Sequence, residues 1–222
     1  MKKLLLTVTL LGLSACTPAH KSMDLTKELD KGSYAIGLQI GQNFKQQNIQ
    51  INDQALSIGI SDALSGKEQL PREEIQKALM TLQQSMMKKS QEISDKNKED
   101  SHKFLVDNKS KDGVKTTASG LQYVIEKEGS GKGPNKDSMV RVNYTGKLID
   151  GSTFDTSIKR NRPAEFKASQ VIPGWSEALM MMKPGGKMKL FIPPELAYGP
   201  SARPGIPANS VLIFEVELIS VN

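Results

Sequence analysis

The spacing of apolar residues changes once along this chain of 222 residues, close to Gly113. Before that point apolar residues recur at helical spacing, as they do between Ile75 and Ile93. After it, short runs of Val, Ile, Tyr and Phe are separated by Gly, Pro, Asn and Asp, a pattern typical of strands and turns. The change predicts an all-helical amino-terminal half and an α+β carboxy-terminal domain.

The first segment has the features of a targeting signal. Met1-Lys2-Lys3 is followed by an apolar run from Leu4 to Leu13, which is too short for the roughly 20 residues of a membrane-spanning helix. Leu13-Ser14-Ala15-Cys16 resembles the bacterial lipobox, so we expect cleavage before Cys16 and lipidation of this residue. Thr17 is not the aspartate that retains lipoproteins at the inner membrane, which favours the outer membrane. The alternative is an ordinary signal cut near Ala15 that leaves Cys16 free.

Two short helices are expected next. One opens at Asp24 and is interrupted at Gly32-Ser33, and the other is capped by Asn52-Asp53 and ends at Gly66. Gly37 to Gly41 has a small-xxx-small spacing, which we interpret as a close helix crossing in a soluble core because polar residues surround it. So little chain cannot cover so many apolar side chains, and an identical chain is the simplest partner.

A long helix is predicted from Pro71 onwards. Its apolar stripe stops at Ile93, and the following stretch from Ser94 to Lys103 is almost wholly polar, which indicates a solvated helix face. A continuous helix from Arg72 to Asp112, ended by Gly113, would be on the order of 60 Å long. The alternative is a disordered polar linker that begins near Ser94.

These patterns divide the chain into five segments. We expect a lipoprotein signal peptide, a lipidated tether, a helical dimerisation domain, a long connecting helix and a carboxy-terminal domain, at residues 1–15, 16–23, 24–70, 71–113 and 114–222. In the last segment we expect a turn at Asp150-Gly151, a helix from Trp175 to Met182, and strands over 120–125, 139–149, 187–192 and 211–221.

Several classes of site are excluded by composition and spacing. The formal net charge is +6, but the lysines alternate with acidic residues and form no basic stripe with aromatics, so nucleic acid is not an expected partner. The single cysteine and the two histidines, His20 and His102, have no metal-ligand spacing, and we expect neither a metal nor a cofactor. Gly129 to Gly133 lacks the ending of a phosphate-binding loop and is better explained as a hairpin loop.

Five ordered motifs in the last segment resemble the FKBP-type peptidyl-prolyl isomerases. The match covers roughly Ser119 to Val221, and the motifs stand at 142–146, 150–155, 171–175, 193–199 and 212–218. The resemblance implies a curved antiparallel sheet of five or six strands around a short helix. It also implies non-covalent catalysis in an aromatic pocket, because rotation about the amide bond before proline breaks no bond to carbon.

The resemblance implies a role for each matching residue. Trp175 would form the pocket floor, and Asp155 and Tyr198 would supply the polar contacts of the catalytic set. The expected substrate-binding residues are Tyr144, Phe154, Val171, Ile172 and Phe214. Ala164 and Arg203 stand where the best-known small members often have an aromatic and a histidine, and these rim positions bear on substrate preference more than on activity. The expected partners are Xaa–Pro segments of unfolded polypeptides and macrolide inhibitors such as rapamycin.

The amino-terminal half narrows the resemblance to the macrophage infectivity potentiator group. Ser33 to Gly37 and Asp62 to Gly66 look like motifs of that group. Its members are homodimers joined through the amino-terminal helices, which implies a dimer contact at Leu56, Ile60 and Leu64. Two alternatives stay open: a dimeric holdase chaperone with secondary catalysis, and a structural surface protein.

Overall fold

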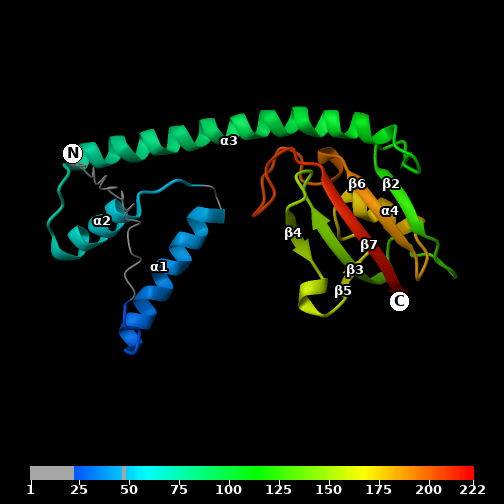
Figure 1. Ribbon diagram of the computed structural model, residues 1–222, viewed down its shortest axis with the longest axis horizontal. Coiled ribbons are helices and arrows are strands. Elements are labelled where there is room, and N and C mark those ends of the chain that lie inside the picture. Colours follow the sequence, from blue (N-terminus) through cyan, green and yellow to red (C-terminus); the bar gives the residue numbers. More distant parts are fainter. Residues whose placement is uncertain (1–22, 47–48) are drawn as a thin grey trace, which may run out of the picture. The chain divides into compact units, whose positions relative to one another are not determined.

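The computed structural model describes residues 23–46 and 49–222 (Figure 1). The expected signal peptide, the lipidation site at Cys16 and all but the last residue of the tether lie outside the described residues. The chain divides into two compact units, with the boundary between Lys45 and Gln46.

The first helix, α1, spans Glu28–Gln46. The expected interruption at Gly32-Ser33 is wrong. The helix continues through both residues, and the Ser33 hydroxyl donates to the carbonyl of Leu29 at 2.9 Å. One glycine costs only about 1 kcal/mol in a helix, which the remaining turns outweigh. None of the residues of α1 is buried within the described chain.

The second helix, α2, spans Asp53–Ser65 and has the expected ends. The Asn52 side chain accepts a hydrogen bond from the Ala55 N–H at 3.0 Å, which satisfies one of the free donors of the first turn. Gly66 ends the helix in the left-handed conformation, with φ of 65°, where glycine carries no steric penalty. Both predicted caps are confirmed.

The long helix, α3, runs without a break over Arg72–Lys109 (Figure 1). Its 38 residues correspond to about 57 Å at 1.5 Å per residue. The segment that begins at Ser94 is helical, so the alternative of a disordered linker is wrong. The helix ends at Lys109, before the predicted stop, and Gly113 lies in the following turn with φ of 77°.

In the described part of the chain, seven antiparallel strands form one sheet after α3. The order across the sheet is β1-β2-β6-β7-β3-β4, and β5 also pairs with β3. The strands are β1 Lys115–Thr116, β2 Gln122–Lys127, β3 Met139–Lys147, β4 Thr153–Thr156, β5 Ala164–Lys167, β6 Lys187–Ile192 and β7 Leu212–Val221. The sheet thus exceeds the five or six strands that the family resemblance implies. The three short strands β1, β4 and β5 are too brief to show a period in the sequence.

A short helix, α4 (Pro173–Met181), covers one face of this sheet (Figure 1). Alternate residues of β3 and β7 point toward it, so Val142, Val216 and Leu218 form the core with Leu179 of α4. The other face carries cross-strand ion pairs, such as Lys187–Glu217 at 3.4 Å. The predicted α+β architecture, with a curved sheet around one helix, is confirmed. Between residues 23 and 222, the described helices include none that is long and apolar enough to cross a bilayer.

Candidate active site

The first turn of α4 fixes the position of Trp175. Pro173 stands at the start of the helix, and the indole, 4% exposed, is directed into the core. A Cβ atom on Gly174 would lie 2.5 Å from Cγ2 of Ile192, so only glycine allows α4 to lie this close to β6. Close packing of the helix on the sheet therefore sets the depth at which the indole lies.

Three aromatic rings surround the indole edge to face. The ring centroids of Tyr144, Phe166 and Phe214 lie 5.3, 5.9 and 5.1 Å from that of Trp175, at interplanar angles of 89°, 83° and 85°. These distances and angles are those that aromatic quadrupoles favour. The Trp175 N–H is buried and has no acceptor among the described residues. The cluster thus forms a rigid apolar floor.

One wall of the site consists of Phe154 and Phe214, whose ring centroids lie 5.5 Å apart at 89°. Both rings lie over Gly146 of β3. A Cβ atom there would lie 2.6 Å from Cζ of Phe154 and 2.7 Å from Cε1 of Phe214. The absence of a side chain at Gly146 is what lets the two rings meet.

The polar edge of the site is a three-membered network. The Tyr144 hydroxyl donates a short hydrogen bond to Oδ2 of Asp155, and Arg160 Nη1 donates to Oδ1 at 3.0 Å. Arg160 Nη2 also donates to the Tyr144 hydroxyl at 2.9 Å, and the guanidinium lies 5.8 Å from the centre of the Tyr144 ring. The network fixes the Asp155 carboxylate at the boundary between the aromatic cluster and solvent.

These contacts shift two pKa values in opposite directions. Burial alone would raise the pKa of Asp155, but the hydrogen bonds from Tyr144 and Arg160 outweigh it and hold the pKa below its usual value. Burial, and then the bond to the Asp155 carboxylate, raise the pKa of Tyr144. At neutral pH the carboxylate is therefore charged and the phenol is neutral.

Three other predicted residues pack against the hydrophobic core that contains Tyr144, Trp175 and Phe214. Val171 and Ile172 are half-buried immediately before α4, and Tyr198 is half-buried after the 3-10 helix η2 (Pro194–Leu196). The guanidinium of Arg203 lies 5.4 Å from the centre of the Tyr198 ring. Of the eight residues assigned to the pocket by resemblance, four therefore belong to the aromatic cluster, Asp155 bonds to one of its members, and three pack against the surrounding core. Leu56, Ile60 and Leu64 lie on α2 and are exposed.

Sequence reasoning missed two residues of the site. Phe166 belongs to the aromatic floor and reaches it because β5 pairs with β3, where Phe166 faces Val140. Arg160 ends the 3-10 helix η1 (Ile158–Arg160) and turns back toward Asp155. A single basic residue five positions after an aspartate carries no recognisable signal in the sequence.

The two pKa shifts predict a flat pH profile. We expect kcat/KM for isomerisation of an Xaa–Pro peptide to be constant from about pH 5 to about pH 9, because neither group titrates there. Asp155 has a lower pKa in the folded chain than its ordinary 3.8, so it stabilises the fold above about pH 4. That contribution is lost as the pH falls through the lowered folded value. A bell-shaped pH profile of kcat/KM with a limb near neutral pH would contradict the charged state assigned to Asp155 and the neutral state assigned to Tyr144.

Comparison with known proteins agrees with the geometry. Residues 29–125 match the domain found amino-terminal to FKBP-type peptidyl-prolyl isomerases, and residues 131–219 match the FKBP-type peptidyl-prolyl cis-trans isomerase domain. The peptidyl-prolyl cis-trans isomerase Mip of Coxiella burnetii is 44% identical over 227 aligned positions, which cover 100% of this chain and 99% of that protein. The chain belongs to the FKBP-type peptidyl-prolyl cis-trans isomerase family.

Other members of the FKBP family are also similar over most of the chain. The outer membrane protein MIP of Legionella longbeachae is 44% identical over 229 positions, covering 100% of this chain and 98% of that protein. The crystal structure of FkpA from Escherichia coli aligns with a TM-score of 0.65 at 37% identity, covering 89% of this chain and 98% of that chain. The predicted family, its Mip-like arrangement and the isomerase class are thereby confirmed.

Proposed function

We propose that the carboxy-terminal domain catalyses cis–trans isomerisation of Xaa–Pro bonds in the aromatic pocket around Trp175. The observation that carries this proposal is the combination, in an FKBP-family domain, of an indole floor with a charged carboxylate at its edge. The assignment of Asp155, Tyr198 and Trp175 as catalytic residues rests on the family motifs that these positions match, and the arrangement of Trp175 and Asp155 supports it. Tyr144, Phe154, Val171, Ile172 and Phe214 would contact the substrate.

The chemistry requires no nucleophile. Rotation about an Xaa–Pro bond has a barrier near 20 kcal/mol because the planar amide has partial double-bond character. An apolar pocket disfavours the more polar planar form, and a proline ring fits between aromatic walls. Polar contacts from Asp155 and Tyr198 accelerate rotation about the amide bond only if they are stronger with the twisted amide of the transition state than with the planar amide of the substrate.

The direct test is isomerase activity of the chain from Thr17 onwards on short Xaa–Pro peptides, with and without rapamycin. We expect catalysis that the macrolide abolishes, because both ligands would occupy the floor over Trp175. Catalysis that rapamycin leaves unchanged would place the active site elsewhere. The absence of catalysis in folded protein would overturn the proposed function and leave only a binding pocket. The holdase alternative is not favoured, because the matched family is one of isomerases.

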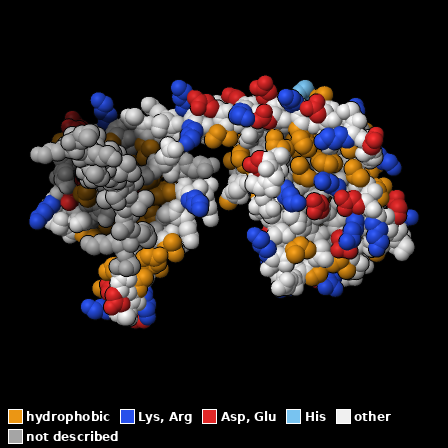
Figure 2. Space-filling model, viewed as in Figure 1, with side chains coloured by type: hydrophobic (Ala, Val, Ile, Leu, Met, Phe, Trp, Pro, Cys, Tyr) orange, Lys and Arg blue, Asp and Glu red, His pale blue; other side chains and the backbone are white. Residues whose placement is uncertain are grey.

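We also propose that two chains associate through the amino-terminal helices. No residue of α1 or α2 is buried in the described chain, although Leu56, Ile60 and Leu64 line one face of α2. Figure 2 shows hydrophobic side chains at the surface over α1. Exposed apolar surface of this kind marks an interaction site.

The dimer proposal predicts that positive charges introduced on the apolar face of α2 will separate the two chains. Leu56→Lys with Ile60→Lys should convert the dimer to a monomer in sedimentation velocity, because two charges would be buried without partners. The matched control is Gln54→Lys, an exposed residue in the first turn of the same helix. A wild-type chain that sediments as a monomer, or a double variant that stays dimeric, would contradict the proposal.

The proposed location is extracytoplasmic. A relative that is 44% identical over its near-complete length is named an outer membrane protein, and residues 1–15 have the pattern of a lipoprotein signal. We propose that Cys16 carries the lipid anchor at the outer membrane. Mass spectrometry of the mature protein should find an acylated Cys16 at its amino terminus, and an unmodified terminus elsewhere would contradict this assignment.

A further inference from the structure

The loop between η2 and β7, residues 197–211, carries Tyr198 near its start. Its two ends are tied together, because the Asn209 N–H donates to the carbonyl of Gly199 at 2.8 Å. Asn209 has φ of 56°, a left-handed conformation that asparagine tolerates better than most residues. The Asn209 N–H therefore anchors the carbonyl of Gly199, the residue that follows Tyr198 in the chain, while the Gly199 N–H donates to the Pro194 carbonyl at 2.8 Å.

Three residues of α3 hold that backbone. The Ser101 hydroxyl donates to the Asn209 carbonyl at 2.7 Å and accepts from the Val211 N–H at 3.1 Å. Asn97 Nδ2 donates to the Ala208 carbonyl at 3.0 Å, and Asn209 Nδ2 donates to the Ser94 hydroxyl at 2.9 Å. Ser101 is 3% exposed, so no solvent replaces its two bonds if the hydroxyl is removed.

The contact face continues along the helix. Ser94, Asn97 and Ser101 lie at positions i, i+3 and i+7, which share one side of a helix. Farther along, Asn108 Nδ2 donates to the Gln122 side chain at 2.9 Å, and both residues are buried. One side of the polar second half of α3 is therefore docked on the carboxy-terminal domain through hydrogen bonds, while Lys96, Lys98 and Glu99 are exposed on the solvated side that the sequence had indicated.

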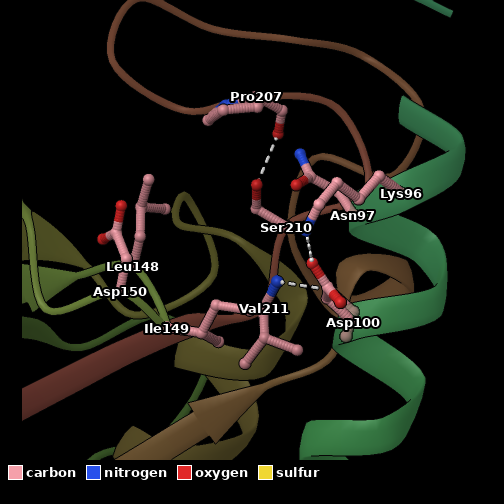
Figure 3. Close-up of a pocket in the computed structure, with 10 residues that line it drawn as sticks. Lys96, Asn97, Asp100, Leu148, Ile149, Asp150, Pro207, Ser210 and Val211 are labelled. Carbon is pink, nitrogen blue, oxygen red and sulfur yellow. Dashed lines mark hydrogen bonds and ion pairs between the residues drawn. The ribbon is translucent and has the colours of Figure 1, made fainter. Parts of the chain in front are cut away.

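A cavity lies beside these hydrogen bonds, and both Asn97 and Ser101 belong to its lining. It has a volume of about 410 Å³ and lies between α3, the β3–β4 turn and the loop (Figure 3). Figure 3 shows Asn97 and Asp100 on the helix opposite Leu148 and Asp150 of the turn, with Pro207 on the loop. Because the turn does not fill this space, the hydrogen bonds to α3 hold the loop where side-chain packing is incomplete.

We propose that Ser101 is a positioning residue of the isomerase, which acts through Asn209 and Gly199 to place Tyr198 at the pocket. The second half of α3 then contributes to catalysis in the carboxy-terminal domain in addition to linking that domain to the amino-terminal helices. This inference rests on the proposed isomerase function. A small displacement of the loop would weaken the contact of the Tyr198 hydroxyl with the twisted amide.

The test compares Ser101→Ala with Ser90→Ala, an exposed serine of the same helix. All variants are assayed at a temperature at which circular dichroism shows them to be folded. Ser101→Ala should lower kcat by about tenfold with a smaller change in KM, and Ser90→Ala should change neither. In a Tyr198→Phe background, Ser101→Ala should add less than about a twofold loss. Equal losses in both backgrounds would show a merely structural role and overturn the proposal.

Nuclear magnetic resonance separates this inference from the isomerase function itself. The Gly199 amide and Tyr198 ring resonances should shift in Ser101→Ala but not in Ser90→Ala, whether or not the chain is active. Unchanged resonances would overturn the positioning role while leaving the isomerase function intact. An inactive wild type would overturn the isomerase function and, with it, the catalytic part of this inference, whatever the resonances show. If Ser101→Ala fails to fold, Asn97→Ala, which removes one bond to Ala208, should give smaller shifts in the same resonances.

Discussion

Replacing Trp175 with alanine is expected to lower the free energy of unfolding of the carboxy-terminal domain by about 3–5 kcal/mol. The indole is 4% exposed and contacts three aromatic rings edge to face, so its removal leaves a cavity that these rings cannot close. The same change removes the pocket floor, and we expect rapamycin binding to be lost.

Urea unfolding is monitored by circular dichroism. Tryptophan fluorescence cannot be used, because Trp175 is the only tryptophan and the variant lacks it. Trp175→Phe is the matched control. It keeps an aromatic ring at the site and should lose less stability than Trp175→Ala. A loss below about 1 kcal/mol in Trp175→Ala would show that the indole is not part of the folded core.

The double variant Asp155→Ala with Tyr198→Phe is expected to lower kcat/KM by about tenfold to a hundredfold, which corresponds to about 1.4–2.7 kcal/mol of transition-state stabilisation. The carboxylate is held charged by Tyr144 and Arg160, and its loss removes the polar edge of the pocket. Tyr198→Phe removes a hydroxyl and leaves the aromatic ring.

The control for this variant is Asp150→Ala with Tyr123→Phe. It also removes one carboxylate and one phenol hydroxyl, but at positions outside the aromatic pocket. Asp150 lies in the β3–β4 turn and accepts from the Ser152 side chain, and Tyr123 lies on β2. This control should retain wild-type kcat/KM. Unchanged catalysis in a folded Asp155→Ala, Tyr198→Phe variant would show that apolar desolvation alone accounts for the activity.

Interactions that are local in the chain could be predicted from the sequence. The Asn52 cap and the Gly66 stop depend on residues within one helical turn, so their residue types sufficed. The aromatic cluster was also predicted, but only because the motifs around Phe154, Trp175 and Phe214 resemble those of a known family. The spacing of apolar residues alone predicted an α+β domain and indicated no functional site in it.

Contacts between distant segments were decided by the tertiary structure. Phe166 reaches the floor through the pairing of β5 with β3, and Arg160 reaches Asp155 because η1 turns the chain back. Ser101 looked like one polar residue among many, yet it is buried because the loop ending at Val211 docks on α3. The sequence by itself determined which segments are helical, both ends of α2 and the order of the domains, because those depend on near neighbours. The network around Asp155 and the docking of α3 depend on which segments meet in space, and only the folded chain decides that.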